Sequence, residues 1–273
     1  MSAPSRNRDD FMAVETGCPL WSRDHLAIGF RMGVWPMSTV SRFKNMIFKP
    51  GREMDDLRRE LGSLLKPGMG SQLLDVGCGE GDATQTYARV LDLPMARVEG
   101  IEPQEKYKYT PPFKVHSLDI EREKFPFPDE KFDIVICNQV LEHLKIVIHP
   151  LREMVRVVRA GGYLVLGIPN LASLMSRVYL AFGRQPICLA FPGPHIRGFS
   201  DRAFRKFLFA NRNLELLKVS GSALYPFPPP LCQTVARMYP GMACYTLYLL
   251  QKVRHDTAAD WPVDQYLDES ITG

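Results

Sequence analysis

The 273-residue sequence is poor in cysteine, in long apolar runs and in net charge. No two of its six cysteines form a Cys-x-x-Cys pair, and none lies near a histidine at zinc-finger spacing, which argues against a structural zinc site. The most apolar runs are about as long as a strand, far shorter than the ~20 residues of a membrane-spanning helix. The charged N-terminus lacks the apolar core of a signal peptide. We therefore expect a cytoplasmic protein without a transmembrane segment.

The small excess of basic over acidic residues also limits the partners. With 34 Lys and Arg against 30 Asp and Glu, the chain carries a formal charge of +4 and has no basic stripe, so nucleic acid is disfavoured as a partner. Hydrophobic residues make up 45% and charged residues 23%, which is the composition of a folded globular protein rather than of a disordered chain. The length suits one domain with additions.

From residue 71 onwards, short apolar runs alternate with helical patterns. Such alternation, with nearly continuous apolar strands, predicts a parallel sheet that is covered by helices on both faces. The predicted strands are 72–76, 97–101, 113–118, 132–137, 163–168, 213–219 and 244–253. The predicted helices are 52–66, 83–91, 150–159, 171–182, 201–210 and one near 231–238.

A glycine-rich loop joins the first of these strands to the helix that follows. Gly77, Gly79 and Gly81 allow a sharp turn and a close approach of a ligand, and the helix offers free N–H groups at its start. Asp82 stands where a dinucleotide fingerprint would carry its third glycine. Asp75, just before the loop, suits a cationic or amine-bearing ligand better than a pyrophosphate. A purely structural turn is the alternative explanation.

An acidic residue ends the second predicted strand. A carboxylate at this position, here Glu102, accepts hydrogen bonds from the two hydroxyls of a ribose. Ligands of parallel α/β sheets bind at the edge where the strands end. Together, the glycine loop and this carboxylate predict a ribose-containing ligand.

Four stretches of the chain resemble the class I S-adenosylmethionine-dependent methyltransferases, in particular those that modify small molecules and glycans. They are LLDVGCGEGDAT (73–84), VEGIEPQE (98–105), SLDIEREKFPFPDEKFDIVICNQVLEHL (117–144) and EMVRVVRAGGYLVLGIPN (153–170). The resemblance continues loosely at 195–200. It implies a Rossmann-like α/β fold with a mostly parallel sheet of seven strands, an antiparallel last strand, helices on both faces and S-adenosylmethionine (SAM) as the cofactor.

The resemblance also implies a set of cofactor contacts. Asp75 and the glycine loop would hold the methionine end, Glu102 the ribose, and Asp119 with Ile120 the adenine. The expected cofactor-binding residues are Asp75, Gly77, Cys78, Gly79, Gly81, Glu102, Pro103, Asp119, Ile120, Asn138 and Gln139.

Two histidines are candidates for the catalytic base. His195 lies in a loop flanked by proline and glycine after the fifth strand, and an imidazole suits removal of a proton from a hydroxyl near neutral pH. His143 follows the fourth strand and is the second candidate. A packing role for either histidine is the alternative.

A bound metal is not expected. One subgroup of the family, resembling ubiquinone-pathway O-methyltransferases and small-RNA terminal methyltransferases, carries Glu-x-x-Glu-His after the fourth strand and binds a divalent metal. Here Gln139 replaces the first of those glutamates, which leaves Glu142 and His143. Because hard cations prefer charged oxygens, these two ligands predict no metal site.

The sequence divides into three expected parts. Residues 1–70 are expected to form a helical N-terminal cap or lid, 71–254 the SAM-binding methyltransferase domain, and 255–273 a flexible tail. Insertions at 170–212 and 221–242 would wall the acceptor side of the domain.

The predicted function is transfer of a methyl group to a small molecule, a sugar or a lipid-linked acceptor, with O-methylation favoured. A nicotinamide-dependent oxidoreductase and a non-catalytic, methyltransferase-like binding subunit are the alternatives. The aromatic and basic segment 21–49 suits a lid over the site, a peripheral membrane contact or simple packing. The sequence does not predict the acceptor or the oligomeric state.

Overall fold

A computed structural model of the chain describes residues 52–103, 111–225, 227 and 231–254. These residues form one seven-stranded sheet with the strand order β3-β2-β1-β4-β5-β7-β6. β7 runs antiparallel to its neighbours β5 and β6, and the remaining pairs are parallel. The sheet and its antiparallel last strand confirm the fold that the sequence predicted.

The strands are short at the start of the chain and long at its end. Their bounds are β1 Leu73–Val76, β2 Val98–Ile101, β3 Lys114–His116, β4 Phe132–Asn138, β5 Val158–Pro169, β6 Leu214–Ser222 and β7 Tyr245–Lys252. The central strands β1 and β4 are buried along nearly their whole length, as their continuous apolar sequences require.

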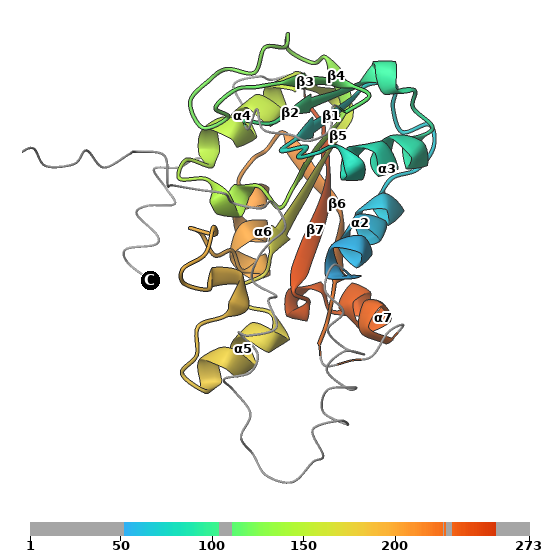
Figure 1. Ribbon diagram of the computed structural model, residues 1–273. Coiled ribbons are helices and arrows are strands. Elements are labelled where there is room, and N and C mark those ends of the chain that lie inside the picture. The colour runs from blue at the N-terminus through green and yellow to red at the C-terminus, as the bar shows by residue number, and fades with distance from the viewer. Residues whose placement is uncertain (1–51, 104–110, 226, 228–230, 255–273) are drawn as a thin grey trace, which may run out of the picture.

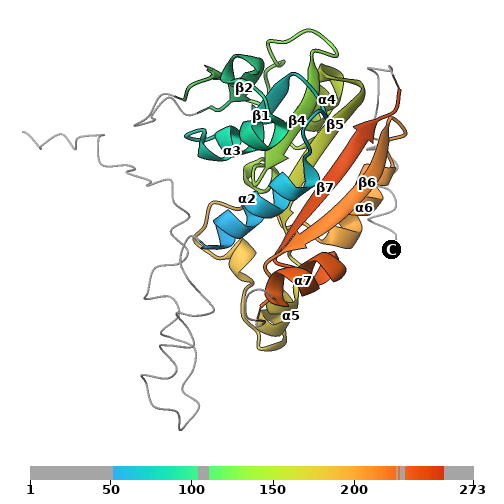
Figure 2. The same cartoon turned by 90° about the vertical axis from the view of Figure 1, so that its right-hand side faces the viewer.

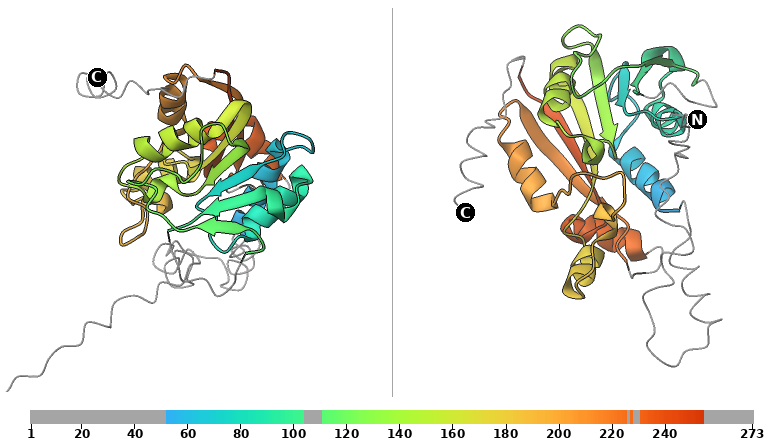
Figure 3. Two further views of the ribbon diagram at one scale, coloured as in Figure 1. Left: turned by 90° about the horizontal axis from the view of Figure 1, so that it is seen from above. Right: turned by 60° about the vertical axis from the view of Figure 1, so that its left-hand side comes forward.

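Helices cover both faces of the sheet, as Figures 1 and 2 show. One face carries α2, α3 and α7, and the other carries α4 and α6, which the right-hand view of Figure 3 brings forward. α5 projects from the end of the sheet near α7. The helix bounds are α2 Arg52–Leu64, α3 Asp82–Leu91, α4 Ile148–Val157, α5 Leu174–Ala181, α6 Asp201–Phe209 and α7 Leu231–Met238.

Two apolar cores, one on each face, hold these layers together. On one face, Leu57 and Leu61 of α2 pack with Tyr87 of α3 against the sheet. On the other, Met154 of α4 and Phe204 of α6 do the same. Burial of about 25 cal/mol per Å² of apolar surface is the main force that fixes helices to such a sheet.

The predicted boundary between the fourth helix and the fifth strand is wrong by several residues. The sequence predicted helix over 150–159 and strand from 163, whereas α4 ends at Val157 and β5 begins at Val158. Val158 already pairs with Phe132 of β4, and Arg159 forms an ion pair with Asp133. These long-range contacts decide the end of the helix, and a local helical pattern does not contain them.

The described helix of the expected N-terminal part is joined to the sheet. Glu60 of α2 is 2% exposed and accepts hydrogen bonds from Gln233 Nε2 at 2.7 Å and Arg237 Nε at 2.8 Å, both on α7. Its carboxylate also accepts a hydrogen bond from Ser220 of β6. α2 therefore packs as a layer of the domain, while 1–51, with the proposed lid segment 21–49, and the tail 255–273 lie outside the described residues.

Among the described residues, no helix combines the length and the apolar character that a bilayer-spanning segment requires.

Candidate active site

The carboxyl ends of three central strands meet at one edge of the sheet. Val76 of β1 is in register with Ile101 of β2 and with Cys137 of β4. The next residues along the chain, Gly77, Glu102 and Asn138, therefore lie at the same level of this edge. The strand order reverses between β1 and β4, which is where ligands of doubly wound sheets bind.

The glycine loop after β1 has the backbone conformation that its sequence predicted. Gly77, Gly79 and Gly81 have φ angles of 78°, 53° and 87°, in the left-handed region that favours glycine. A Cβ at Gly77 would lie 2.3 Å from a methyl group of Val140, and one at Gly81 would meet the Phe113 ring at 3.0 Å. Packing therefore fixes the two outer glycines.

Gly79 differs from its two neighbours because its α-carbon faces open space. A Cβ there would meet no atom of the described residues within 4 Å. The N–H groups of Gly77 and Cys78 donate to the Ile101 carbonyl, at 2.8 and 3.2 Å, so the base of the loop is tied to β2. The tip of the loop is thus left free to approach a ligand closely.

The carboxylate after β2 is turned toward this loop rather than away from it. Glu102 Oε2 accepts a hydrogen bond from the Gly79 N–H at 3.1 Å, and its own N–H donates to the His116 carbonyl of β3. The side chain is half-buried. The carboxylate therefore lies against the glycine loop at this edge of the sheet.

Asp75 is buried beneath the loop and is 3% exposed. Its Oδ2 accepts a hydrogen bond from Thr84 Oγ1 at 2.5 Å. Burial raises the pKa of Asp75 to about 7, an effect that the Thr84 hydrogen bond opposes and the negative charge of Glu102 reinforces. Two acidic side chains close together favour a cationic ligand group, because a positive charge relieves their repulsion.

The other residues predicted to contact the cofactor differ in how far they are buried. The Cys78 side chain is buried in the core, so its contribution to the loop comes from its backbone. Burial also raises the pKa of its thiol well above the ordinary range. Ile120 is likewise buried, and Pro103 is exposed. Asp119 is half-exposed, and its Oδ1 accepts the Glu121 N–H at 3.0 Å.

The Asn138 side chain packs over a glycine of β5 that the sequence pattern does not single out. A Cβ at Gly167, the partner of Asn138 in the sheet register, would lie 2.1 Å from Asn138 Oδ1. This amide oxygen is buried and accepts no hydrogen bond from any described residue, whereas Nδ2 lies 3.4 Å from the Tyr87 hydroxyl. Strand pairing, which becomes visible only in three dimensions, is the signal that identifies Gly167.

A second polar group follows β4. Gln139 adopts a φ of 58°, and its Nε2 is buried without a partner among the described residues. Glu142 is fully buried, and neither of its carboxylate oxygens has a hydrogen-bond partner in the part of the chain that the structure describes. Desolvation raises the pKa of Glu142 to about 8.

The two histidines predicted as bases meet at Glu142. The His143 and His195 rings contact edge to face with centroids 4.7 Å apart, and one ligand atom each of Glu142, His143 and His195 all lie within 4.8 Å of one another. Burial lowers the pKa of His195, so its imidazole is neutral at pH 7. The structure therefore brings together residues that are more than 50 positions apart in the sequence.

The loop that carries His195 is docked on the segment after β4. The N–H groups of Ile196 and Arg197 donate to the Glu142 carbonyl at 2.9 and 3.2 Å. The Arg197 guanidinium donates to the Leu144 carbonyl at 2.9 Å and to the Lys145 carbonyl. Arg197 thus fixes the loop, a role that the sequence does not reveal.

Comparisons with known proteins agree with this geometry. The family model described as "Methyltransferase domain" matches residues 74–166. Residues 74–166 therefore carry the methyltransferase domain of the family that the sequence resembles. This match lies within residues 73–170, over which the four resembling stretches extend.

The curated relatives of this methyltransferase domain include proteins named O-methyltransferase. A 27-O-demethylrifamycin SV methyltransferase of Amycolatopsis mediterranei is 30% identical over 131 residues, 43% of this chain and 47% of that protein. A ubiquinone biosynthesis O-methyltransferase of Albidiferax ferrireducens is 29% identical over 134 residues, 45% of this chain and 51% of that protein. The chain spans about half the length of the curated relatives it matches.

Solved structures agree on the fold. A SAM-dependent methyltransferase of Thermotoga maritima superposes with a TM-score of 0.52 at 20% identity, and covers 79% of this chain and 95% of that one. SAM is the methyl donor of this family. The residues at the sheet edge fit it, since the open space at Gly79 admits a ligand and the Glu102 carboxylate faces that space.

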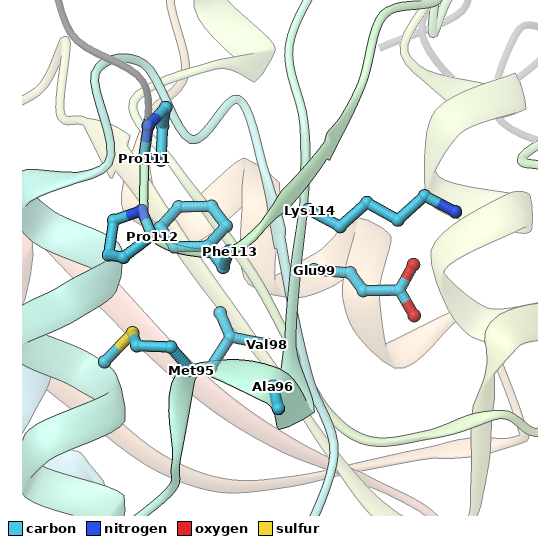
Figure 4. Close-up of a pocket in the computed structure, with 8 residues that line it drawn as sticks. All are labelled: Met95, Ala96, Val98, Glu99, Pro111, Pro112, Phe113 and Lys114. Carbon is cyan, nitrogen blue, oxygen red and sulfur yellow. The ribbon is translucent and has the colours of Figure 1, made fainter.

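A separate hollow of about 520 Å³ lies between β2, β3 and the α3 side of the sheet (Figure 4). Its lining includes Met95, Glu99, Phe113 and Lys114. None of the predicted cofactor-binding or catalytic residues lines it, so it is distinct from the site described above.

Proposed function

We propose that the protein transfers a methyl group from SAM to an oxygen of a small molecule, a sugar or a lipid-linked acceptor. The observation that carries the proposal is the pairing of two unlike sites at one sheet edge. An acidic glycine-loop site lies after β1 and β2, and a histidine-containing polar cluster lies after β4. The sequence prediction of a cytoplasmic location stays a prediction.

The first site supplies the donor side of the reaction. SAM brings a methyl group already activated on a sulfonium, so the protein needs chiefly to bind and orient it. Asp75 and the Gly79 backbone would hold the methionine end, Glu102 the ribose hydroxyls, and Asp119 with the backbone of Ile120 the adenine. The carboxyl groups of Asp75 and Glu102 favour a ligand that carries a sulfonium and an ammonium group, because a nearby positive charge favours the ionised form of Asp75.

The second site supplies the acceptor side. A hydroxyl acceptor must lose a proton during transfer, and a neutral imidazole is suited to take it. His195 and His143 both lie beside the segment after β4, with His143 exposed and His195 half-buried. The names of the curated relatives also favour oxygen as the acceptor atom.

Large exposed apolar side chains occur in the His195 loop and near the end of α5. Leu180 and Phe182 near the end of α5, and Phe191 in the His195 loop, are 56%, 78% and 89% exposed. Large apolar side chains that remain exposed around a site are typical of a surface that contacts apolar ligands. This favours an acceptor with a hydrophobic portion, such as a lipid-linked sugar, over a fully polar one.

The two alternatives make different predictions for ligand binding. Calorimetry on the full chain with S-adenosylhomocysteine and with NAD should give one binding event per chain for the first ligand and none for the second. Binding of NAD without binding of S-adenosylhomocysteine would replace the proposal with an oxidoreductase.

A transfer assay then separates an enzyme from a binding subunit. We expect label from methyl-tritiated SAM to appear in at least one of three acceptor sets: phenols, free sugars and polyprenyl-linked sugars. Tight binding of S-adenosylhomocysteine with no transfer to oxygen, nitrogen or carbon in any set would favour the non-catalytic binding subunit.

A further inference from the structure

We propose that the segment 171–198 binds the surface of an anionic lipid bilayer. The segment leaves the domain after β5 and returns to it before α6, and its two ends are joined. Asn170 pairs with Phe199 in an isolated β-bridge, and the Leu171 N–H donates to the Phe199 carbonyl at 2.8 Å. The segment contains α5, which projects from the end of the sheet in Figures 1 and 2, and the loop of His195. We call it the α5 protrusion.

Contacts within the α5 protrusion hold it in one shape. The Arg177 guanidinium donates to the Ala172 carbonyl at 2.8 Å, and His195 Nδ1 lies 2.8 Å from the Cys188 carbonyl. Leu174, in the first turn of α5, packs against a small apolar cluster to which α7 contributes. The protrusion is therefore anchored at its base, and its outer side chains are presented on a defined backbone.

The first argument is that α5 is apolar and yet remains exposed. Six residues of its eight-residue sequence LMSRVYLA are apolar, but the only buried residue of the helix is the polar Ser176. α6 follows the ordinary pattern, in which the apolar Phe204 and Leu208 are buried. A helix that is apolar on most of its surface normally lies in a protein core or in a membrane. Because the described domain does not bury α5, the interface of a bilayer is the environment that fits it.

The second argument is the number of exposed apolar side chains on this one protrusion. Val178, Leu180 and Phe182 extend along α5 and past its end, and Phe191 and Ile196 lie in the loop. All five are between 44% and 89% exposed. Single exposed apolar side chains are common on proteins, whereas several gathered on one element mark a contact surface. Side chains of this kind insert at the boundary between the lipid headgroups and the acyl chains.

The charge of the protrusion selects an anionic partner. Residues 171–198 contain three arginines, at positions 177, 184 and 197, and no Asp or Glu. The chain as a whole is nearly balanced, with 34 basic and 30 acidic residues, so this asymmetry is local. Basic side chains beside an apolar surface are attracted to anionic headgroups. A second copy of the chain fits this surface less well, because two such surfaces carry charge of the same sign.

The inference goes beyond the proposed function. His195, one of the two candidate bases, belongs to the protrusion, and its ring contacts that of His143. Docking of the protrusion would therefore bring both imidazoles close to the lipid headgroups. Under the proposed function, a lipid-linked acceptor would then reach the site without leaving the bilayer. Only this last step rests on the proposed function, since binding to a bilayer requires no methyl transfer.

Cosedimentation of the full chain with sucrose-loaded vesicles tests the proposal without an activity assay. We expect binding to vesicles made of equal parts of phosphatidylglycerol and phosphatidylcholine. Vesicles of phosphatidylcholine alone should bind about a hundredfold more weakly, since each basic residue near an anionic surface strengthens binding about fivefold. Phe182→Ser and Phe191→Ser should each weaken binding to the anionic vesicles about tenfold, and Arg184→Gln about fivefold.

Phe209→Ser is the matched control. Phe209 is also an exposed phenylalanine, but it ends α6, about 12 Å along the helix from the first residue, Asp201. This variant should bind vesicles like the wild type, and circular dichroism should show that all four variants are folded. Since Phe182 and Phe191 occupy separate parts of the protrusion, either variant decides the result if the other fails to fold.

Three results would overturn the proposal: no binding of the wild type to the anionic vesicles, binding that the two protrusion variants leave unchanged, or an equal loss in Phe209→Ser. A dimer in analytical ultracentrifugation that Phe182→Ser abolishes, without vesicle binding, would also overturn it and assign the surface to a second copy of the chain. Vesicle binding without methyl transfer to any acceptor would overturn the proposed function alone.

Discussion

The glycine-loop side and the β4 side of the sheet edge differ in how their polar groups are satisfied. Below the loop, Asp75 accepts from Thr84 and Glu102 accepts from Gly79. After β4, the buried Asn138 Oδ1 and the Glu142 carboxylate have no partner among the described residues. We call the glycine-loop side the complete region, because these acidic groups have hydrogen-bond partners there, and the β4 side the incomplete region, because its buried oxygens lack them.

The difference suggests different roles for the two regions. An unpaired buried polar group costs about 1–3 kcal/mol, so a fold retains several in one place only where something offsets that cost. A preformed site binds a ligand with little rearrangement, whereas an incomplete one gains most when a ligand supplies the missing partners. We therefore expect substitutions to affect the two regions in opposite ways.

The largest expected effect concerns binding at the complete region. Glu102→Gln should weaken S-adenosylhomocysteine binding about thirtyfold, since a hydrogen bond to a charged group contributes about 2 kcal/mol. Calorimetry measures this directly. Glu99→Gln is the matched control. Glu99 lies on β2, the strand that Glu102 follows, and it pairs with Lys131 and His116 instead. Equal affinities of the two variants would remove Glu102 from the site.

Removing a partner from the complete region should destabilise the protein, and removing an unpaired group should not. Thr84→Val leaves the buried Asp75 carboxyl without its donor, and should lower the free energy of unfolding by about 2 kcal/mol in urea denaturation. Glu142→Gln should leave the stability unchanged or higher. A large loss in Glu142→Gln would show that a partner of this carboxylate exists after all.

The raised pKa of Asp75 predicts a particular dependence on pH. Its native pKa of about 7 lies above the ordinary aspartate pKa of 3.8, so between these values the folded state holds a proton that the unfolded state has released. This contribution to stability therefore falls as pH rises toward 7 and is constant above it. Asp75→Asn lacks the effect, so its stability relative to the wild type should rise by about 1 kcal/mol per pH unit between pH 5 and 7.

Urea denaturation of both proteins over this pH range measures the difference. A difference that is flat from pH 5 to 7 would mean that Asp75 ionises as an ordinary carboxylate in the folded protein.

The smallest effect separates backbone strain from ligand contact. Gly79→Ala and Gly183→Ala both place a Cβ at positive φ, 53° and 65°, with no described atom within 4 Å. Each should lose about 1 kcal/mol of stability. Only Gly79→Ala should also weaken S-adenosylhomocysteine binding, by about tenfold, because its methyl group enters the space proposed for the ligand. Equal binding by both variants would place the ligand elsewhere.

Much of the fold was predictable because its signals are local. Apolar runs predicted each described strand, and the Ser200 side chain caps α6 by accepting from the Ala203 N–H. The glycines before α3 required positive φ angles, and they have them. The start of β5 was missed because pairing with Phe132 and an ion pair with Asp133 decide it.

The sequence by itself determined the layered α/β sheet, the glycine loop and the acidic residue after β2, because strand periodicity and glycine chemistry are properties of neighbouring residues. Only the tertiary structure decided that Gly167 supports Asn138, that Arg197 fixes the His195 loop, and that both histidines meet at Glu142. Those contacts join segments far apart in the chain, and the burial that leaves Glu142 unpaired exists only once the sheet, its helices and that loop have packed together.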